Sequence, residues 1–295
     1  MDNSRRTFLK IAGIAAAGLT AAPAVTSLAS SASPSKGGKV VRNPEALTAK
    51  HWGMVIDTRK LTTSADLEPI IEACHRIHNV PTFEDDLMMP QLPCRMAETE
   101  SLKQSCEKVN EKIPKISSDK KRHEIKWIWE EEFHNLFPDQ LNPYLTEHLE
   151  HLPFLTLCNH CANPSCVQAC PTKATFQRED GIVLMDFHRC IGCRFCMAAC
   201  PYGSRSFNFR DPRQGLKEIN TAFPTRMKGV VEKCNFCAER LSKGQMPACV
   251  EASNGTILFG DLNDPESEVR KALKENYAVR RQPSLGTEPS VYYIL

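Results

Sequence analysis

Cysteine is the residue type of this chain that is best suited to chemistry. The 295 residues include fourteen cysteines, and eleven of these fall between Cys158 and Cys249. A thiolate is a nucleophile and a metal ligand, and crowding of this kind favours metal binding over a lattice of disulfides. The pattern therefore indicates metal chemistry in the second half of the chain.

The clearest motif is a compact run of four cysteines that ends in proline. In such a run three thiolates surround one 4Fe-4S cluster, and the fourth cysteine serves the neighbouring cluster. An earlier run has the same form with a longer middle spacer, so we expect the two runs to exchange their fourth ligands. The two runs are Cys190-x2-Cys193-x2-Cys196-x3-Cys200-Pro201 and Cys158-x2-Cys161-x4-Cys166-x3-Cys170-Pro171.

Two further cysteine groups are incomplete. Cys234-x2-Cys237-x11-Cys249 is followed by Ser253 at the position where a fourth cysteine is expected. An internal repeat matches residues 54–61 to residues 183–190, but Leu61 stands in the place of Cys190. The only cysteine left in that first copy is Cys74.

These gaps are consistent with one another if the first and last cysteine groups also exchange their fourth ligands. One cluster would need three early cysteines of the first copy and a cysteine at 253, and all four are missing. The opposite cluster finds all of its ligands, so the sequence predicts three complete 4Fe-4S clusters. The predicted sets are Cys158, Cys161, Cys166 and Cys200 (cluster 1); Cys190, Cys193, Cys196 and Cys170 (cluster 2); and Cys234, Cys237, Cys249 and Cys74 (cluster 3).

Zinc and disulfides are the competing interpretations of the same cysteines. Zinc sites also use C-x2-C pairs, but a triplet closed by x3-Cys-Pro does not suit a single tetrahedral ion. Cys94 and Cys106 have no place in the cluster scheme, and a disulfide or free thiols are expected for them.

Several histidine, lysine and arginine residues lie close in sequence to the predicted ligands. The histidines are expected to pack or to donate hydrogen bonds, because each thiolate set is already complete. The cations are expected either to raise the cluster potentials or to be solvated. The residues in question are His75, His160, His188, Lys173, Arg189, Arg194 and Arg205.

Short strands and helices must position these motifs. The sequence predicts a buried strand over 52–57, a helix over 67–77, a surface insertion over 84–121, a strand over 123–129 and a helix over 143–152. Strands are also expected to run into the ligand loops at Cys190 and Cys234. The predicted fold class is α+β, with tandem bacterial-ferredoxin-like modules of the two-cluster type and loop-rich insertions.

The amino-terminal residues resemble a twin-arginine export signal. Arg5 and Arg6 precede an apolar stretch over 11–22 and a Ser/Ala/Pro-rich stretch that reaches Ser35. The apolar stretch is short for a membrane span. We therefore expect a periplasmic protein that is exported folded and is peripheral on the membrane. The expected divisions are 1–35 (signal and linker), 36–156 (amino-terminal part with Cys74 and the insertion), 157–215 (cluster module) and 216–295 (last cysteine motif and carboxy-terminal wrap).

The cysteine region resembles the iron-sulfur subunits of the dimethyl-sulfoxide reductase and polysulfide reductase family. The resemblance is carried by the segments 157–175, 188–203, 231–237, 259–262 and 285–293. It implies an electron-transfer subunit, not an enzyme by itself, beside a quinone-interacting membrane partner of the NrfD type. For the exported members that serve dissimilatory sulfur metabolism, it also implies a multihaem cytochrome c partner.

Other function classes receive little support. The 37 basic and 35 acidic residues leave a net charge of +2, and no basic face indicates nucleic acid. No glycine-rich dinucleotide fingerprint follows a strand, which argues against a separate substrate site. An iron-sulfur subunit of a molybdopterin oxidoreductase and a zinc-stabilised assembly module remain as alternatives.

Overall fold

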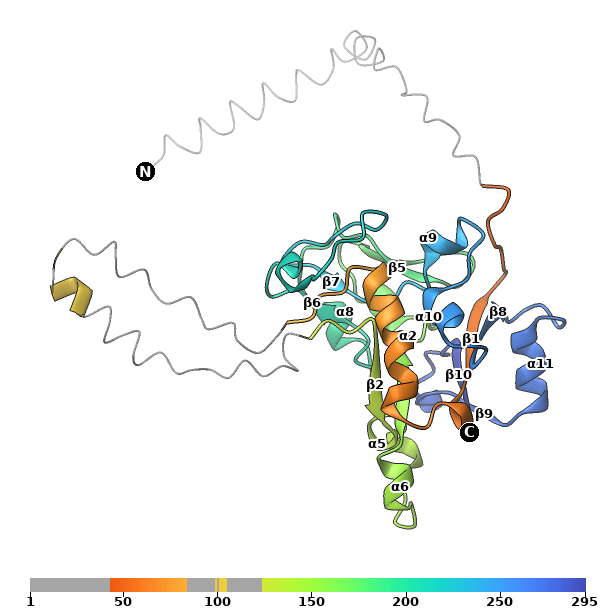
Figure 1. Ribbon diagram of the computed structural model, residues 1–295. Coiled ribbons are helices and arrows are strands. Elements are labelled where there is room, and N and C mark those ends of the chain that lie inside the picture. Colours follow the sequence, from red (N-terminus) through yellow and green to blue (C-terminus); the bar gives the residue numbers. More distant parts are fainter. Residues whose placement is uncertain (1–42, 84–98, 100, 105–123) are drawn as a thin grey trace, which may run out of the picture. The chain divides into compact units, whose positions relative to one another are not determined.

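A four-stranded sheet joins segments that are far apart in the sequence (Figure 1). The computed structural model describes residues 43–83, 99, 101–104 and 124–295. The strand order is β8 (Ile257–Asp261), β1 (Trp52–Asp57), β10 (Val291–Ile294) and β9 (Ala278–Val279). Strand β1 runs parallel to β10 and antiparallel to β8. The sheet therefore ties the start of the described chain to its last residues.

Strand β1 is buried on both faces, as its run of apolar residues predicts. Met54 and Ile56 point into the main core, whereas Val55 points to the opposite face and packs in a second apolar cluster. The alternation follows from the pleat of a strand. Helix α11 (Glu268–Glu275) covers that second face through Val269 and Ala272. The predicted strand over 52–57 is confirmed.

Helix α2 (Ser64–Ile77) carries Cys74 into the core. It begins with a capping box, in which Asp66 accepts hydrogen bonds from the backbone and hydroxyl groups of Thr63. Leu67, Ile70 and Cys74 are buried at the spacing of one helical face. That face packs against α10 (Ala248–Ala252). The predicted helix over 67–77 is confirmed, and it starts one turn earlier.

Three two-stranded antiparallel sheets surround the cysteine loops. They pair β2 (Ile128–Glu132) with β3 (Pro153–Leu157), β4 (Thr175–Gln177) with β5 (Val183–Met185), and β6 (Ser206–Phe207) with β7 (Val231–Glu232). The remaining short helices are α5 (Phe133–Leu136), α6 (Glu147–Glu150), α7 (Ser165–Gln168), α8 (Phe195–Ala198) and α9 (Ala238–Leu241). Turns of 3-10 helix cover Thr58–Lys60, Pro138–Gln140, Pro212–Gly215 and Pro283–Leu285. This mixture of helices and strands agrees with the α+β class.

Two predicted elements differ from the structure. The strand expected over 123–129 begins only at Ile128, since Ile125 and Trp127 are buried in the core before the ladder starts. The helix expected over 143–152 is the single turn α6. Leu152 already accepts a hydrogen bond from the backbone of Phe133, so the chain joins the β2–β3 ladder before a second helical turn can form.

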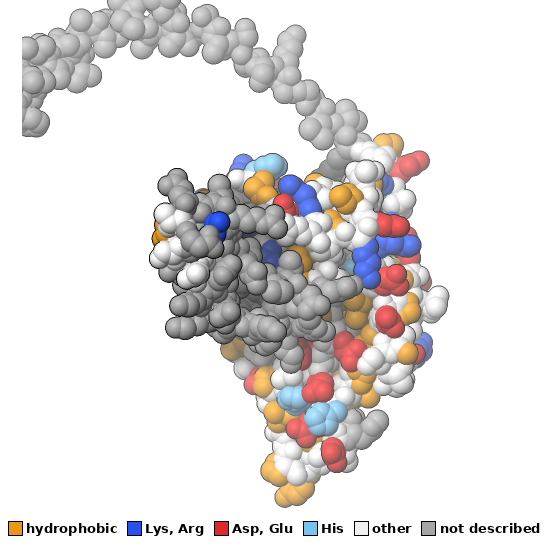
Figure 2. Space-filling view, turned by 60° about the vertical axis from the view of Figure 1, so that its left-hand side comes forward, with side chains coloured by type: hydrophobic (Ala, Val, Ile, Leu, Met, Phe, Trp, Pro, Cys, Tyr) orange, Lys and Arg blue, Asp and Glu red, His pale blue; other side chains and the backbone are white. Residues whose placement is uncertain are grey.

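Acidic and basic side chains are interspersed on the face of the molecule that Figure 2 shows. Histidine and acidic side chains lie together toward the lower end of that view. An oxygen of Glu132 lies 3.3 Å from the Nδ1 of His134 and 3.4 Å from the Nδ1 of His151. Within the described residues, no helix combines the length and the apolar character that a membrane crossing requires.

Candidate iron-sulfur sites

One backbone feature is shared by the first C-x2-C loop of each of the three cysteine runs. In each loop the residue just before the second cysteine has a positive φ: 42° at His160, 70° at Gly192 and 54° at Phe236. Side chains other than glycine seldom adopt this region, and such strain gathers at functional sites. A turn of this kind also directs successive N–H groups into one concavity, which suits an anion such as an iron-sulfur cluster.

The first cavity is lined by Cys158, Cys161, Cys166 and Cys200. Burial, and then the neighbouring thiol of Cys158, raise the pKa of Cys161 to about 12. Four thiolates in this space therefore need a compensating cation. The side-chain amide of Asn159 also lines the cavity, and both its nitrogen and its oxygen are buried without a hydrogen-bond partner. The orphaned amide N–H is a donor suited to a cluster sulfur.

The second cavity is lined by Cys170, Cys190, Cys193 and Cys196. It lies closer to the surface, because three of the four thiols are only partly buried. Burial would raise the pKa of Cys170, but the backbone N–H of Thr175 and the hydroxyl of Thr172 outweigh it and lower that pKa. The Thr175 N–H lies 3.5 Å from the Sγ of Cys170.

The third group brings Cys74 to Cys234, Cys237 and Cys249, and all four thiols are buried. Burial, and then Cys237, Cys234 and Cys249, raise the pKa of Cys74 well above its usual value. Burial also raises the pKa of Cys249 to about 12. Helix α2 carries Cys74 and helix α10 carries Cys249, and the packing of these two helices brings the two cysteines together.

Backbone N–H groups point at two thiols of the third group. The N–H of Phe236 lies 3.4 Å from the Sγ of Cys234, and the N–H of Ala248 lies 3.4 Å from the Sγ of Cys237. Such contacts stabilise the ionised form of a thiol. They favour thiolate ligands at a place where burial alone opposes ionisation.

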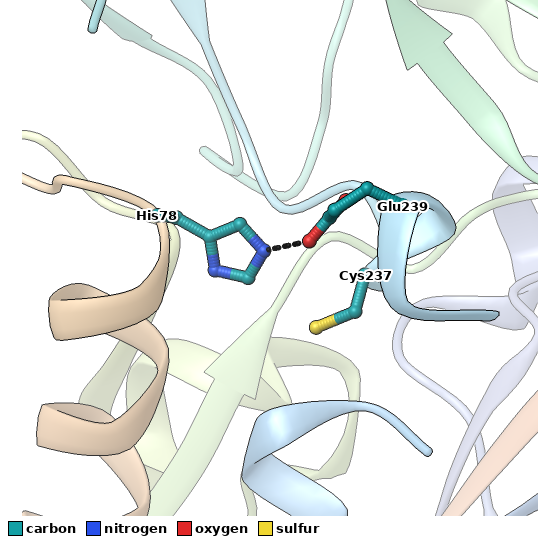
Figure 3. A group of neighbouring side chains, drawn as sticks. All are labelled: His78, Cys237 and Glu239. Atoms are coloured by element: carbon teal, nitrogen blue, oxygen red, sulfur yellow. Dashed lines mark hydrogen bonds and ion pairs between the residues drawn. The ribbon is translucent and has the colours of Figure 1, made fainter. Parts of the chain in front are cut away.

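His78 lies against the third group, and sequence reasoning did not identify it (Figure 3). Its Nε2 is 2.8 Å from Oε1 of Glu239, and its Nδ1 is 3.0 Å from the carbonyl oxygen of Cys74 and 3.6 Å from the Sγ of that residue. Each ring nitrogen thus faces an oxygen that can accept a hydrogen bond. The spacing of four residues from Cys74 on a helical face was the available clue.

Two buried cations lie near the thiols, and neither forms an ion pair with a carboxylate of the described residues. The Nη2 of Arg205 donates a hydrogen bond of 3.0 Å to the Sγ of Cys166. The Nζ of Lys233 donates to the carbonyl oxygens of Cys234, at 2.6 Å, and of Val183. By contrast, the equally buried Arg226 pairs with the carboxylate of Glu232 at 2.6 Å. Buried charges need compensation, which for Arg205 comes from cysteine sulfur.

The other residues that the sequence singled out lie around these groups. His75 contacts the carbonyl oxygen of Ile128 through Nε2 at 3.0 Å, and His160 accepts a hydrogen bond at Nδ1 from the N–H of Val183. Arg194 lines the second cavity. His188, Lys173 and Arg189 are exposed, and Arg189 pairs with Asp186 at 3.2 Å.

The positions of the missing cluster are filled by ordinary core contacts. Leu61 is buried in the main apolar core. The hydroxyl of Ser253 donates to the carbonyl oxygen of Val250 at 2.7 Å and accepts from the N–H of Ile257 at 3.1 Å. Cys94, Cys106 and the predicted export signal lie outside the described residues.

This donor set fits 4Fe-4S clusters. Each group offers four cysteine sulfurs, which is the ligand number of one such cluster. The sites also supply buried surroundings, N–H donors and cations, the features that tune a cluster. An arrangement of this kind can hold electrons away from water.

Comparison with known proteins gives the same chemistry. A family model described as a 4Fe-4S dicluster domain matches residues 149–218. The chain is 38% identical over 312 residues to the "Hdr-like menaquinol oxidoreductase iron-sulfur subunit 1" of Archaeoglobus fulgidus, covering 98% of this chain and 97% of that protein.

Two other relatives cover less of the chain. The "Menaquinone reductase, iron-sulfur cluster-binding subunit" of Nitratidesulfovibrio vulgaris is 36% identical over 213 residues, which are 64% of this chain and 81% of that protein. A tetrathionate reductase subunit of Salmonella typhimurium is 43% identical over 141 residues, 47% of this chain and 50% of that protein. The similarity to the tetrathionate protein is thus confined to about half of each chain.

Proposed function

The chain belongs to the family of iron-sulfur electron-transfer subunits of respiratory oxidoreductases, and we propose that it relays electrons one at a time through three 4Fe-4S clusters. The proposed ligands are the three groups of four cysteines described above. The observation that carries the proposal is the third group, in which Cys74 meets Cys234, Cys237 and Cys249 across a large gap in the sequence. A chance cluster of cysteines within one segment would not include Cys74.

A bound 4Fe-4S cluster supplies one-electron chemistry at each site. The protein's own residues set the conditions. The thiols hold the iron, the buried walls exclude water, and the N–H groups of Thr175, Phe236 and Ala248 stabilise negative charge on sulfur. No substrate site is needed for this role, so the chain acts as a subunit and not as an enzyme in its own right.

The order of the sites along the path follows from their neighbours. Cys158 of the first group acts electrostatically on Cys234 of the third, and Cys166 of the first group acts on Cys196 of the second. The first site therefore lies between the other two. Electrons would enter or leave through the partly exposed second site and the deeper third site.

The proposed electron source or acceptor is a quinone-reactive membrane subunit. The relatives named for menaquinol oxidation and menaquinone reduction support this assignment. We propose an NrfD-type subunit on one side and an exported multihaem cytochrome c on the other, as in the DsrO subunit of the DsrMKJOP complex of dissimilatory sulfur metabolism. Purification of the native complex, with identification of its subunits, tests both partners.

The proposed location is the periplasmic side of the membrane, after export by the twin-arginine route. The test replaces Arg5 and Arg6 by lysine in the full chain, which keeps the charge and removes the arginine pair. The double variant, with lysine at both positions, should stay in the cytoplasm with its clusters inserted. Normal export of that variant would contradict the proposal.

Two alternative functions keep specific support. The similarity to a tetrathionate reductase subunit favours an iron-sulfur subunit of a molybdopterin oxidoreductase, which subunit identification would reveal. The ligand atoms of His78, Cys237 and Glu239 lie within 4.8 Å of one another, a donor set that also suits zinc. A zinc-stabilised assembly module is therefore the candidate of another class.

Metal and sulfide analysis distinguishes an iron-sulfur protein from the zinc-stabilised module. The full chain, prepared without oxygen, should contain about twelve irons and as much acid-labile sulfide, four of each per cluster. The variant Cys190→Ala should lack the second cluster, so its iron and its acid-labile sulfide should each be lower by about a third than in the wild type. Zinc without labile sulfide would overturn the cluster assignment and support the assembly module.

A further inference from the structure

Arg205 lies between the first and the second thiol groups. Helices α7 and α8, which carry Cys166 and Cys196, pack against each other, and both cysteines belong to one small apolar cluster. The Nη2 of Arg205 donates a hydrogen bond of 3.0 Å to the Sγ of Cys166. The guanidinium therefore binds a thiol of the first group at the place where the helix that carries Cys196 of the second group packs.

A second connection runs through Thr175. The Nη1 of Arg205 donates to the Oγ1 of Thr175 at 3.2 Å, and the backbone N–H of Thr175 points at the Sγ of Cys170. Cys170 is a member of the second group, so Thr175 links Arg205 to a thiol of that group. The planar fork of a guanidinium permits donation in both directions at once.

Among the described residues, cysteine sulfur is the only negative partner of this cation. Arg205 is 4% exposed, and no carboxylate within that part of the chain forms an ion pair with it. The ligand sulfur that accepts a hydrogen bond from this guanidinium, within the described residues, is the Sγ of Cys166, at 3.0 Å. For Arg226, which is also buried, the carboxylate of Glu232 compensates the positive charge. Arg205 is therefore arranged for charge on the cysteine groups.

We propose that Arg205 is a counter-charge shared by the first and second clusters, and that it raises both of their reduction potentials together. The inference rests on the proposed function. One electron adds one negative charge to a cluster, and a nearby buried cation stabilises that reduced form. Because one residue serves both clusters, it raises both potentials in the same direction, so the two clusters become easier to reduce together and the driving force for transfer between them changes little.

Lys233 gives the matched comparison. It is 2% exposed and donates to the carbonyl oxygen of Cys234 in the third group. Its other acceptor, the carbonyl oxygen of Val183, belongs to a residue that lines the first cavity. Lys233 is accordingly expected to act on the third and first clusters and not on the second. Arg194 lines only the second cavity and provides a control that reports on one cluster.

The test is a redox titration of the full chain followed by electron paramagnetic resonance. Cys190→Ala and Cys74→Ala first assign the signals by deleting the second and the third cluster. Arg205→Met should make reduction of the first and second clusters less favourable by about tenfold each, a fall of about 59 mV for one electron, and leave the third unchanged. Lys233→Met should spare the second cluster, and Arg194→Gln should alter only the second.

The outcomes separate the inference from the proposed function. Wild-type protein without iron and labile sulfide removes the proposed function itself. Full iron with a shift in only one cluster, or in none, overturns the sharing by Arg205. If Arg205→Met does not retain iron, Arg205→Gln is titrated in its place. If neither variant retains iron, Arg205→Lys decides, because it keeps the positive charge and should hold both potentials near those of the wild type; a tenfold loss in either cluster of that variant would overturn the role of charge.

Discussion

His78 and Glu239 form a 2.8 Å hydrogen bond that joins the end of helix α2 to helix α9 at the edge of the third thiol group. The His78 ring also stacks on Trp127 with a centroid distance of 4.6 Å. The pair holds Cys74 against Cys237, although these two cysteines come from distant parts of the sequence. It is therefore a structural link on which the third site depends.

His78→Phe should weaken that link while it keeps the aromatic packing. The variant loses both side-chain contacts of the ring, so Glu239 keeps only its hydrogen bond from Asn235 and the Cys74 carbonyl keeps only that from the backbone N–H of residue 78. We expect a cost of about 1 to 3 kcal/mol. We expect faster loss of about a third of the iron to a chelator. His188→Phe is the matched control, since His188 is exposed next to the second group. Equal iron loss in the two variants would contradict the assigned role.

Cys74→Ala should remove the third cluster and leave the other two. Cys74 contacts the third group alone, so the iron content should fall from about twelve to about eight per chain. Iron analysis and electron paramagnetic resonance measure this change. Cys94→Ala and Cys106→Ala should keep the full iron content. Loss of signal from the first or second cluster in the Cys74 variant would show that the ligand pairing is wrong.

Ser253→Cys should not create a fourth cluster. The Ser253 hydroxyl is held by Val250 and Ile257, and Leu61, at the place of another missing ligand, is buried in the core. A single new thiol cannot assemble a site that needs four. The iron content of this variant should therefore stay at about twelve, and a value near sixteen would refute the view that the fourth site, at Leu61 and Ser253, has been lost as a whole.

The sequence predicts the ligand groups better than the surroundings that support them. C-x2-C spacing is a local property, and the buried run over 52–57 and the helical stripe with Cys74 depend on short-range periodicity. Both elements appear as expected, as β1 and α2. The helix expected over 143–152 forms only one turn, because Leu152 already bonds to the backbone of Phe133 and strand β3 begins at the next residue. The partner strand lies outside the segment, so the segment's own sequence does not predict this.

The supporting cations and donors depend on tertiary structure. Arg205 was identified as one of several cations near the cysteines, but only its burial between α7 and α8 distinguishes it from the exposed Lys173 and Arg189. The orphaned amide of Asn159 is equally invisible in the sequence, since most asparagines lie in turns or at the surface. Burial and missing partners are properties of the fold.

Gly192→Ala should damage the second cluster site for two separable reasons. Gly192 has a φ of 70°, and a Cβ there would lie 2.5 Å from the carbonyl oxygen of Gly229. The matched control is Gly203→Ala, because Gly203 has a φ of 63° but would meet no atom within 4 Å. The control should cost about 1 to 2 kcal/mol from backbone conformation alone.

Gly192→Ala should exceed that cost, since the backbone must shift to relieve the clash and the C-x2-C loop then loses its concave arrangement of N–H groups. Thermal unfolding of the iron-loaded chain gives the stability difference, and iron analysis shows whether the second cluster is retained. We expect a lower melting temperature for both variants, with loss of about four irons only for Gly192→Ala. Equal stability and full iron in the two variants would show that the close approach of Gly192 to Gly229 does not shape the second site.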